Sequence, residues 1–498
     1  MPSTSDINSI FNKFQASIEE KMSVWTQSIT PAGFRDTENE VMGLCRGLAD
    51  QIIIFILCKI LRDASFIVDV STALRRSKIH MRHGGYKSTK VRLLGGSVAH
   101  FEKVLYMKPK KKKGTPGRKR GIGKRGKGSD AFFPMLAALG IFNKCTPALT
   151  EEMVYQVSSS ESVRGARDSL ARRNIDFGHK ETLDVFNKVS KGLVQQRNEE
   201  LERVLKSQEP LTTVLAGKRV VVATDGGRIR IRTNKKGRKT KSGRHGFEAD
   251  WKEPKVITIY TIDQQGNLEK SFSPLYDGTM GDADKVFEML TGYLIALGGA
   301  HAEELIVLGD GAKWIWNRVD SLSEKVGISR KRITQVVDWY HAVETLWEIV
   351  RARGAWSKKQ QQKWIKKAKG LLAAGQITAL LVQIRALCRG RKSKDISKHL
   401  DYFLRNVQRM QYASFKERNI PKGSGAIESA VRRIVNMRLK GNAKYWLRDN
   451  AEGMLLIRSY LKSGRLGGLL LSSREQKNEW WINHLYPAEN HSLLGTLY

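Results

Sequence analysis

Residues 220–227 read Val220-Val221-Val222-Ala223-Thr224-Asp225-Gly226-Gly227, an apolar run that ends on an acid and two glycines. A short, continuous run of this kind predicts a strand that is buried on both faces. Asp225 would then lie at the end of a rigid strand, and the glycines would let a ligand approach the backbone closely.

A second run has the same design, because residues 304–310 are apolar and end on Asp310. Alternating or apolar patterns predict further strands at 228–232, 255–262 and 268–275, which we expect to form an antiparallel group with a basic loop at 233–250. A helix is predicted at 282–297. Strands first, followed by a helix and a buried strand, is the order of an RNase H-like sheet.

The predicted fold class is therefore an α/β RNase H-like catalytic core with a mixed sheet, interrupted by an all-α insertion. Helical and helix-turn-helix-like N-terminal domains precede it. The predicted segments are an N-terminal helical region at 1–75, a small hairpin plus basic linker at 76–130, a helix-turn-helix-like DNA-binding domain at 131–205, the first part of the core at 206–345, the helical insertion at 346–420, the C-terminal core helices with a third acid at 421–465, and a tail at 466–498.

The charge of the chain points to a polyanionic partner. Its 498 residues carry 87 Lys and Arg against 49 Asp and Glu, a formal net charge of +38. Double-stranded DNA is the expected partner, because its negatively charged phosphates attract a protein with such a positive charge. The longest apolar run, Ile52 to Leu61, includes Lys59 and is too short to span a bilayer, so we expect a buried helix and no membrane partner.

Cysteine usage and the N-terminus bear on location. The four cysteines form no CxxC pair, which argues against a zinc ribbon and a disulfide framework. The first residues lack a positive region followed by an apolar stretch. We expect a cytoplasmic, nucleoid-associated protein.

Residues 108–127 hold eleven Lys or Arg among glycines and prolines, with no acid. Such a segment is a flexible tether, and the same segment can also follow DNA phosphates. Farther on, short helices and a turn at 174–178 predict a helix-turn-helix whose third helix would bring His179 and Lys180 to DNA. The residues predicted to contact DNA are Lys110, Lys111, Lys112, Arg118, Lys119, Arg120, His179, Lys180, Arg228, Arg230, Lys235, Lys236, Arg238, Lys239, Arg432, Arg433, Arg438 and Lys440.

Asp225 and Asp310 are the candidate catalytic pair. Two carboxylates at the ends of adjacent strands can bridge two metal ions about 4 Å apart, which activate a water or a 3′-hydroxyl and stabilise the leaving oxygen. Mg²⁺ prefers such ligands, so two Mg²⁺ (or Mn²⁺) ions per active site are expected. Each Asp-Gly alone is more often a turn, and only the pair favours chemistry.

A third acid is needed, and Glu428 is the preferred candidate, predicted to face inward from the first turns of a helix. An acid at a helix start is also favoured by the helix dipole alone. Glu344 is the competitor, because it follows Asp310 by 34 residues. One further interpretation stays open: Trp314, Trp316 and Trp339 either stack on a base or belong to the core.

Four motifs in order carry a family resemblance: Asp225-Gly226-Gly227-Arg228, Asp310-Gly311-Ala312-Lys313-Trp314-Ile315-Trp316, Asp338-Trp339-Tyr340-His341-Ala342-Val343-Glu344 and Gly423-Ser424-Gly425-Ala426-Ile427-Glu428-Ser429. Over residues 130–465 the chain resembles the ISKra-type bacterial insertion-sequence transposases, which are similar to the Mutator-like group. The resemblance implies an acidic-triad RNase H-like fold with a helical insertion and with Asp225, Asp310 and Glu428 as metal ligands. It also implies that His341 lies near the active site, where it either positions water or a phosphate or is merely structural. Cysteine pairs that would bind zinc near residues 89–107 are common in such relatives and are missing here.

The predicted function is a DDE-type DNA transposase, a polynucleotidyl transferase. It would bind terminal inverted repeats and target DNA as a homo-oligomer, a dimer or higher, in the synaptic complex. Two alternatives are an RNase H-like nuclease that hydrolyses without joining, and a catalytically inert, transposase-derived DNA-binding protein. The intact acids argue against the second alternative.

Overall fold

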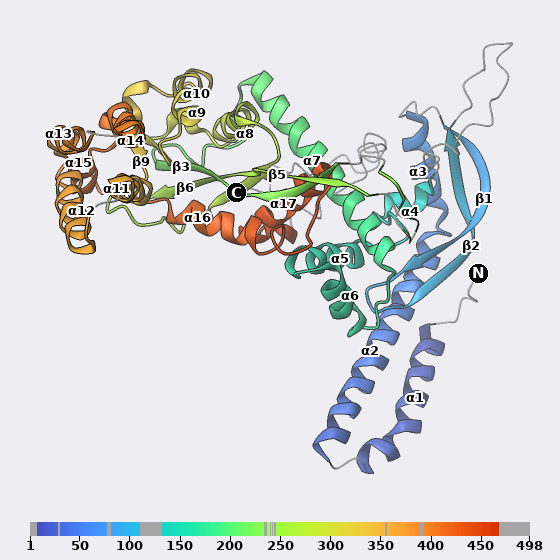
Figure 1. Ribbon diagram of the computed structural model, residues 1–498. Coiled ribbons are helices and arrows are strands. Elements are labelled where there is room, and N and C mark those ends of the chain that lie inside the picture. Colours follow the sequence, from blue (N-terminus) through green and yellow to red (C-terminus); the bar gives the residue numbers. More distant parts are fainter. Residues whose placement is uncertain are drawn as a thin grey trace. The chain divides into compact units, whose positions relative to one another are not determined.

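A computed structural model describes residues 7–27, 30–76, 81–109, 132–233, 237–239, 241, 243, 246–353, 356–388 and 393–467 (Figure 1). The chain forms two compact units, and the division falls between Gly192 and Leu193. Most of the predicted basic linker, including its six predicted DNA contacts, lies outside the described residues, as does the predicted tail.

The first unit begins with a helical hairpin, α1 (Ile7–Gln27) and α2 (Pro31–Ile60), followed by α3 (Ala64–Arg76). The start of α2 is fixed by sequence, because Thr30 accepts the backbone N–H of Gly33 and Pro31 occupies the first turn.

In the part of the chain that the structure describes, α2 is the one helix long and apolar enough to cross a membrane by length and composition. Its C-terminal part instead packs against the hairpin, and Ile54, Leu57 and Cys58 are buried there. The prediction of a buried helix at residues 52–61 holds for one face only, because Ile53 and Ile56 are exposed.

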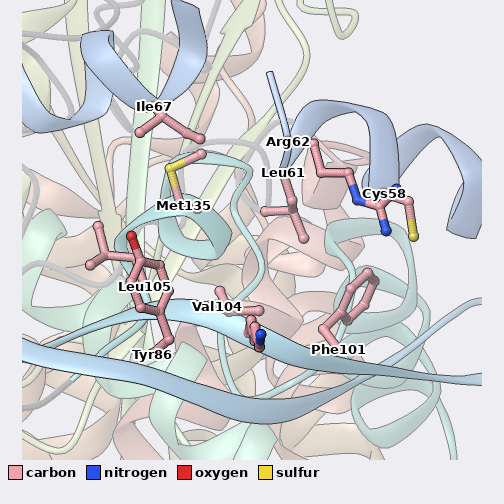
Figure 2. Close-up of a pocket in the computed structure, with 10 residues that line it drawn as sticks. Cys58, Leu61, Arg62, Ile67, Tyr86, Phe101, Val104, Leu105 and Met135 are labelled. Carbon is pink, nitrogen blue, oxygen red and sulfur yellow. The ribbon is translucent and has the colours of Figure 1, made fainter. Parts of the chain in front are cut away.

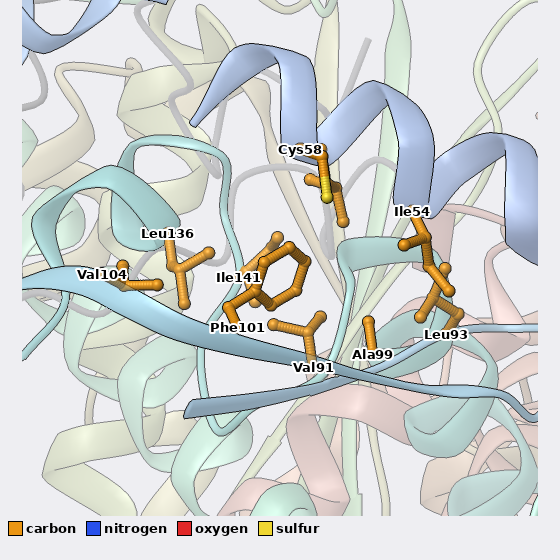
Figure 3. Close-up of a cluster of buried hydrophobic side chains, with 10 residues drawn as sticks. Ile54, Cys58, Val91, Leu93, Ala99, Phe101, Val104, Leu136 and Ile141 are labelled. Carbon is orange, nitrogen blue, oxygen red and sulfur yellow. The ribbon is translucent and has the colours of Figure 1, made fainter. Parts of the chain in front are cut away.

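The predicted hairpin is present and longer than expected, with β1 (Met81–Arg92) paired antiparallel to β2 (Val98–Pro109). Asp50 of α2 accepts the backbone N–H groups of Gly95 (3.0 Å) and Ser97 (2.8 Å), which fixes the turn. Apolar side chains from α2, both strands and the following helix meet in one core, which Figure 3 shows. Beside this core lies a cavity of about 70 Å³ lined by Tyr86, Leu105 and Met135, among others (Figure 2).

The remaining helices of the first unit are α4 (Pro134–Ala138), α5 (Pro147–Ser159), α6 (Val163–Ala171) and the first part of α7 (His179–Ser207). Two short helices followed by a longer third one match the predicted order. The long helix α7 continues past the division between the units.

The second unit is built on a mixed α/β core with a five-stranded sheet in the order β7-β6-β3-β8-β9. The strands are β3 (Arg219–Gly226), β6 (Lys255–Ile262), β7 (Leu275–Thr279), β8 (Glu304–Gly309) and β9 (Ile333–Val337). The first three in the chain pair antiparallel, whereas β3, β8 and β9 run parallel. The apolar runs of β3 and β8 are buried throughout, as expected for central strands.

Two predictions about strands were wrong, and two strands were not predicted. The strand at 228–232, which is β4 (Ile229–Thr233), does not join the sheet but pairs with β5 (Glu248–Lys252), because its alternating arginines suit a half-exposed ribbon. The last antiparallel strand begins at Leu275 rather than at residue 268. The sequence reading also missed β5 and β9.

Helices cover both faces of the sheet (Figure 1). On β7, Asp277 faces α8 (Ala283–Ala296) through a hydrogen bond with Tyr293, whereas a Cβ on the neighbouring Gly278 would contact Leu455 of α17 (Arg448–Lys462). Since successive residues of a strand point to opposite faces, α8 and α17 lie on opposite sides of the sheet. The helix α16 (Gly425–Val431), which continues as a π-helical turn at Arg432–Asn436, packs on β3 and β6.

Between β9 and α16 the described residues are helical, as predicted for the insertion. The helices that follow β8 and β9 are α9 (Lys313–Trp316), α10 (Val319–Val326), α11 (Trp339–Arg353), α12 (Lys358–Ala373), α13 (Ile377–Leu387), α14 (Ser393–Asn406) and α15 (Tyr412–Glu417). Short 3₁₀ turns lie at Gly299–His301, Arg330–Arg332 and Val407–Arg409.

Candidate active site

The register of the parallel strands places Asp225 beside Asp310. Ala223 pairs with Leu308, an interval of 85 residues, and the same interval separates the two acids. Neighbouring strands are roughly 4.8 Å apart, and residues in register on parallel strands point to the same face. The carboxylates therefore start side by side at the carboxyl edge of the sheet.

Asp225 is half-buried and has little to neutralise it. Burial raises the pKa of its carboxyl group, and nearby Asp310 and Glu253 add to this, whereas the Gly226 N–H and the positive form of His341 oppose it. The Gly226 N–H donates to Asp225 Oδ1 at 2.7 Å. Among the described residues, no Lys or Arg forms an ion pair with Asp225 or Asp310. This is the electrostatic state of a carboxylate that can take a cation.

The loop that carries Asp310 is held from behind by Tyr402 of α14. The Tyr402 hydroxyl donates to the backbone oxygen of Asp310 at 3.0 Å, and a Cβ on Gly311, whose φ is +90°, would collide with the Tyr402 ring. Asp310 Oδ1 accepts the Ala312 N–H at 2.9 Å. The helical segment thus fixes the backbone of Asp310 and leaves the second carboxylate oxygen open.

Asp338 follows the next parallel strand in register with Asp310, since Gly309 pairs with Val337. It is fully buried, and it accepts the N–H groups of Tyr340 (2.5 Å), His341 (3.1 Å) and Ser424. Its oxygens are therefore used in capping α11 and in fixing the loop before α16. Asp338 is a positioning residue.

Ser424 links this cap to Glu428, because its hydroxyl donates to Glu428 Oε1 at 2.9 Å. A Cβ on Gly227 would lie 3.6 Å from Val431, one turn after Glu428 on the same face of α16. Glu428 therefore lies at the same edge of the sheet as the two aspartates. Its side chain is exposed, however, so the prediction that it faces inward was wrong.

Glu344 and His341 lie on the first turns of α11. His341 is half-buried and within electrostatic range of Asp225, and its Nδ1 lies 3.7 Å from the exposed carboxylate of Glu344. Glu344, the alternative candidate for the third acid, is thus close to His341, which in turn is close to Asp225. The geometry is compatible with either Glu428 or Glu344 as the third acid.

The structure does not bring all three predicted ligands together. In the described ranges, no three His, Cys, Asp or Glu side chains converge as a metal site. Asp225 and Asp310 are paired by register, and Glu428 is turned toward Ser424.

Most described residues that were predicted to bind DNA are exposed. These are His179, Lys180, Arg228, Arg238, Lys239, Arg432, Arg433 and Lys440. Arg230 is half-buried, and its guanidinium donates to the Gly441 backbone oxygen at 2.8 Å. Lys235 and Lys236 lie outside the described residues.

Arg438 is a correction, because its side chain is only 5% exposed and packs on the Trp446 ring at 5.2 Å. Burial lowers its pKa to about 10. A residue in this setting supports the fold rather than a phosphate contact.

The three tryptophans near the site are explained by packing. Trp316 is buried, Trp339 packs edge-on against Tyr412 at 4.9 Å, and Trp314 packs against Phe287 at 6.2 Å. Trp316 therefore belongs to the core, whereas Trp314 and Trp339 are half-buried and packed against other rings.

Sequence reasoning missed Glu253 and Tyr402. Glu253 precedes β6, and a Cβ on Gly226 would collide with its carboxylate, so this glycine is what allows the acid near Asp225. The signal available in the sequence was an acid shortly before β6, the strand that pairs antiparallel with β3. Tyr402 lies 92 residues beyond Asp310, and nothing local indicated that contact.

Comparison with known proteins adds no relative: no family model matches the chain, and no curated protein or solved structure is similar to it.

Proposed function

We propose that this chain is a DNA transposase that cuts DNA at the ends of a mobile element and joins them to target DNA, using an RNase H-like core. One observation carries the proposal: two carboxylates in register on adjacent parallel strands, without a basic partner among the described residues. Three antiparallel strands followed by a helix and parallel strands support the RNase H-like assignment. The charge of +38 supports DNA as the partner, and the site of action is then the nucleoid in the cytoplasm.

The residues present fit a pair of divalent cations, since Asp225 and Asp310 supply oxygen ligands at the same end of adjacent parallel strands. Mg²⁺ or Mn²⁺ held there would activate the attacking oxygen and stabilise the leaving oxygen. Asp225 and Asp310 would hold the fixed positions. Glu428 would complete the ligand set in place of its bond to Ser424, and Asp338 holds the loop that carries Ser424.

Other side chains bind and orient the DNA. Arg228 follows Gly227 directly, and Arg432 and Arg433 follow Glu428 by one turn, so exposed cations flank the acids on two sides. Phosphate contacts of this kind position the backbone without reading sequence. His341 positions the attacking water or the scissile phosphate, and Glu344 accepts a hydrogen bond from His341 when the ring is oriented toward it.

The test is metal-dependent cleavage and joining of a labelled duplex that carries the end of the chain's own mobile element. Asp225→Asn should reduce cleavage about a thousandfold, because a metal ligand contributes several kcal/mol to the transition state. Glu428→Gln should do the same, whereas Glu344→Gln and Glu253→Gln should keep most activity.

Loss with Glu344→Gln alone moves the third ligand to Glu344. Cleavage without joining replaces the transposase by a hydrolytic nuclease. Duplex binding without any cleavage by the wild type favours an inert DNA-binding protein.

A further inference from the structure

The β4–β5 ribbon carries aromatic and basic side chains on one face. Arg230 pairs across the ribbon with Trp251, and Arg232 pairs with Ala249. Because directly paired residues and every second residue along a strand share a face, these side chains lie together, and Phe247 at the start of β5 extends the row.

A third segment adds Tyr445 to this face. Arg232 donates its backbone N–H to Trp446, and Trp446 donates to Arg230, so the segment before α17 runs along the free edge of β4. The Tyr445 ring lies 5.0 Å from the Phe247 ring.

The side chains form a continuous ladder in the order Trp251, Arg230, Tyr445, Phe247 and Arg232. The Arg230 guanidinium lies 5.4 Å from the Trp251 ring centre and 4.8 Å from that of Tyr445. Arg232 lies 5.7 Å from the ring of Phe247. We name these five residues the ribbon ladder.

The rings of the ladder are exposed although they are large: Trp251 by 51%, Phe247 by 45% and Tyr445 by 39%. The acids of β5 do not neutralise it, because Glu248 and Asp250 alternate with Trp251 and point to the other face. Asp250 is paired there with Lys252 at 3.8 Å. The ladder therefore presents aromatic surface within a positive field.

We propose that the ribbon ladder is a stacking site for unpaired nucleotides of a single DNA strand. Bases have π faces that stack on aromatic rings regardless of sequence, and arginines add cation–π contacts and phosphate pairing. Bases in an intact duplex stack on each other and cannot use such a site. The ladder spans about 13 Å along β5, which suits a short run of nucleotides.

This inference rests on the proposed function and deepens it. β4 starts four residues after Asp225, so a strand held on the ladder would leave the duplex close to the proposed point of cleavage. The ladder would hold the strand that must separate from its complement when the DNA is cut.

The experiment measures binding of the full-length chain, with EDTA and no added metal, to labelled oligo(dT) and to a blunt duplex of equal length. Trp251→Ala should weaken oligo(dT) binding about tenfold and change duplex binding less than about twofold. Trp251→Phe should keep most of the affinity. Phe34→Ala, which removes an exposed ring from α2 in the first unit, should change neither.

Equal loss on both DNAs, or no loss on oligo(dT), overturns the inference and leaves the ladder as a brace within the ribbon. Preference for an acidic peptide over oligo(dT) overturns it as well. If Trp251→Ala lowers the melting temperature, Tyr445→Ala replaces it as the deciding variant. Because no metal is present, Trp251-dependent binding by a chain that never cleaves DNA would refute the proposed function alone, and cleavage without that binding would refute the ladder alone.

Discussion

Two groups of acids in the second unit differ in how their charges are satisfied. Asp277 is fully buried on β7, where Arg197 pairs with it at 3.1 Å and the Tyr293 hydroxyl donates to it at 2.6 Å. Arg197 also pairs with Glu452 of α17 at 2.8 Å. At Asp225, by contrast, the groups that lower the pKa are the Gly226 N–H and the positive form of the neighbouring His341.

Burial raises the pKa of both aspartates, but the surrounding groups differ in how they change each pKa further. At Asp277 the Arg197 guanidinium and the Tyr293 hydroxyl work against the rise in pKa, although the neighbouring Glu452 adds to it. At Asp225 two more acids, Asp310 and Glu253, add to it. An acid surrounded by donors holds a fold together, whereas an acid set among other acids is available to a cation from solution.

Removing the cation from the group formed by Arg197, Asp277 and Glu452 should give the largest effect on stability. Arg197→Met leaves Asp277 and Glu452 without their cation inside the unit, and such a change costs about 3–5 kcal/mol. Hydrogen exchange of the β7 and α17 amides measures it, because both elements contact this group.

Lys206→Met on the same helix is the matched control. Lys206 pairs with Glu202 in an exposed i,i+4 contact at 2.7 Å, which is worth under about 1 kcal/mol. Similar losses from both variants would show that the Arg197 group is not what stabilises the unit.

The central strands were predictable from sequence because their signals are local. The apolar runs that end on Asp225 and Asp310 were predicted as buried strands. The interval of 85 residues between the two acids is also the interval between paired residues of β3 and β8. The ribbon was not predictable as a separate sheet, because the alternation of Arg230 and Arg232 is the same whether the partner strand lies in the core or outside it.

The candidate site was predictable only where a residue terminates a strand. Asp310 and His341 lie close enough to Asp225 to shift its pKa, because Asp225 is near the end of one strand and the other two residues follow neighbouring strands. The orientation of Glu428 was not predictable, because a helix start does not specify which way the side chain turns, and here Ser424 donates to its carboxylate. Arg438 was misassigned since the stacking on Trp446 is a contact made only in three dimensions.

Added metal should sharpen the contrast between the two groups. Mg²⁺ at about a hundred times its dissociation constant stabilises the form that binds it by about 2.7 kcal/mol. Hydrogen exchange should slow at residues 225–227 and 310–312 and stay unchanged around Asp277, and EDTA should reverse this. The same slowing in Asp225→Asn would mean that Mg²⁺ acts elsewhere.

The smallest expected effect concerns the stability cost of keeping Asp225 ionised. Its folded-state pKa is raised, so its contribution to stability is fully favourable below the unfolded value of about 3.9 and is lost as pH rises through the folded pKa. Near pH 7 the ionised carboxylate therefore destabilises the fold, and Asp225→Asn should add about 0.5–2 kcal/mol while abolishing cleavage.

Asp263 provides a control for which the expected change in stability has the opposite sign. Asp263 accepts the N–H groups of Gln265 (2.9 Å) and Asn267 (2.8 Å), and these bonds lower its pKa, so Asp263→Asn should reduce stability at the same pH. Hydrogen exchange of the β3 and β6 amides at pH 5 and pH 7 reports both variants. If Asp225→Asn destabilises β3 at pH 7 as Asp263→Asn destabilises the turn after β6, then the Asp225 carboxylate is a structural acid like Asp277, and the edge of the sheet is not poised for a cation.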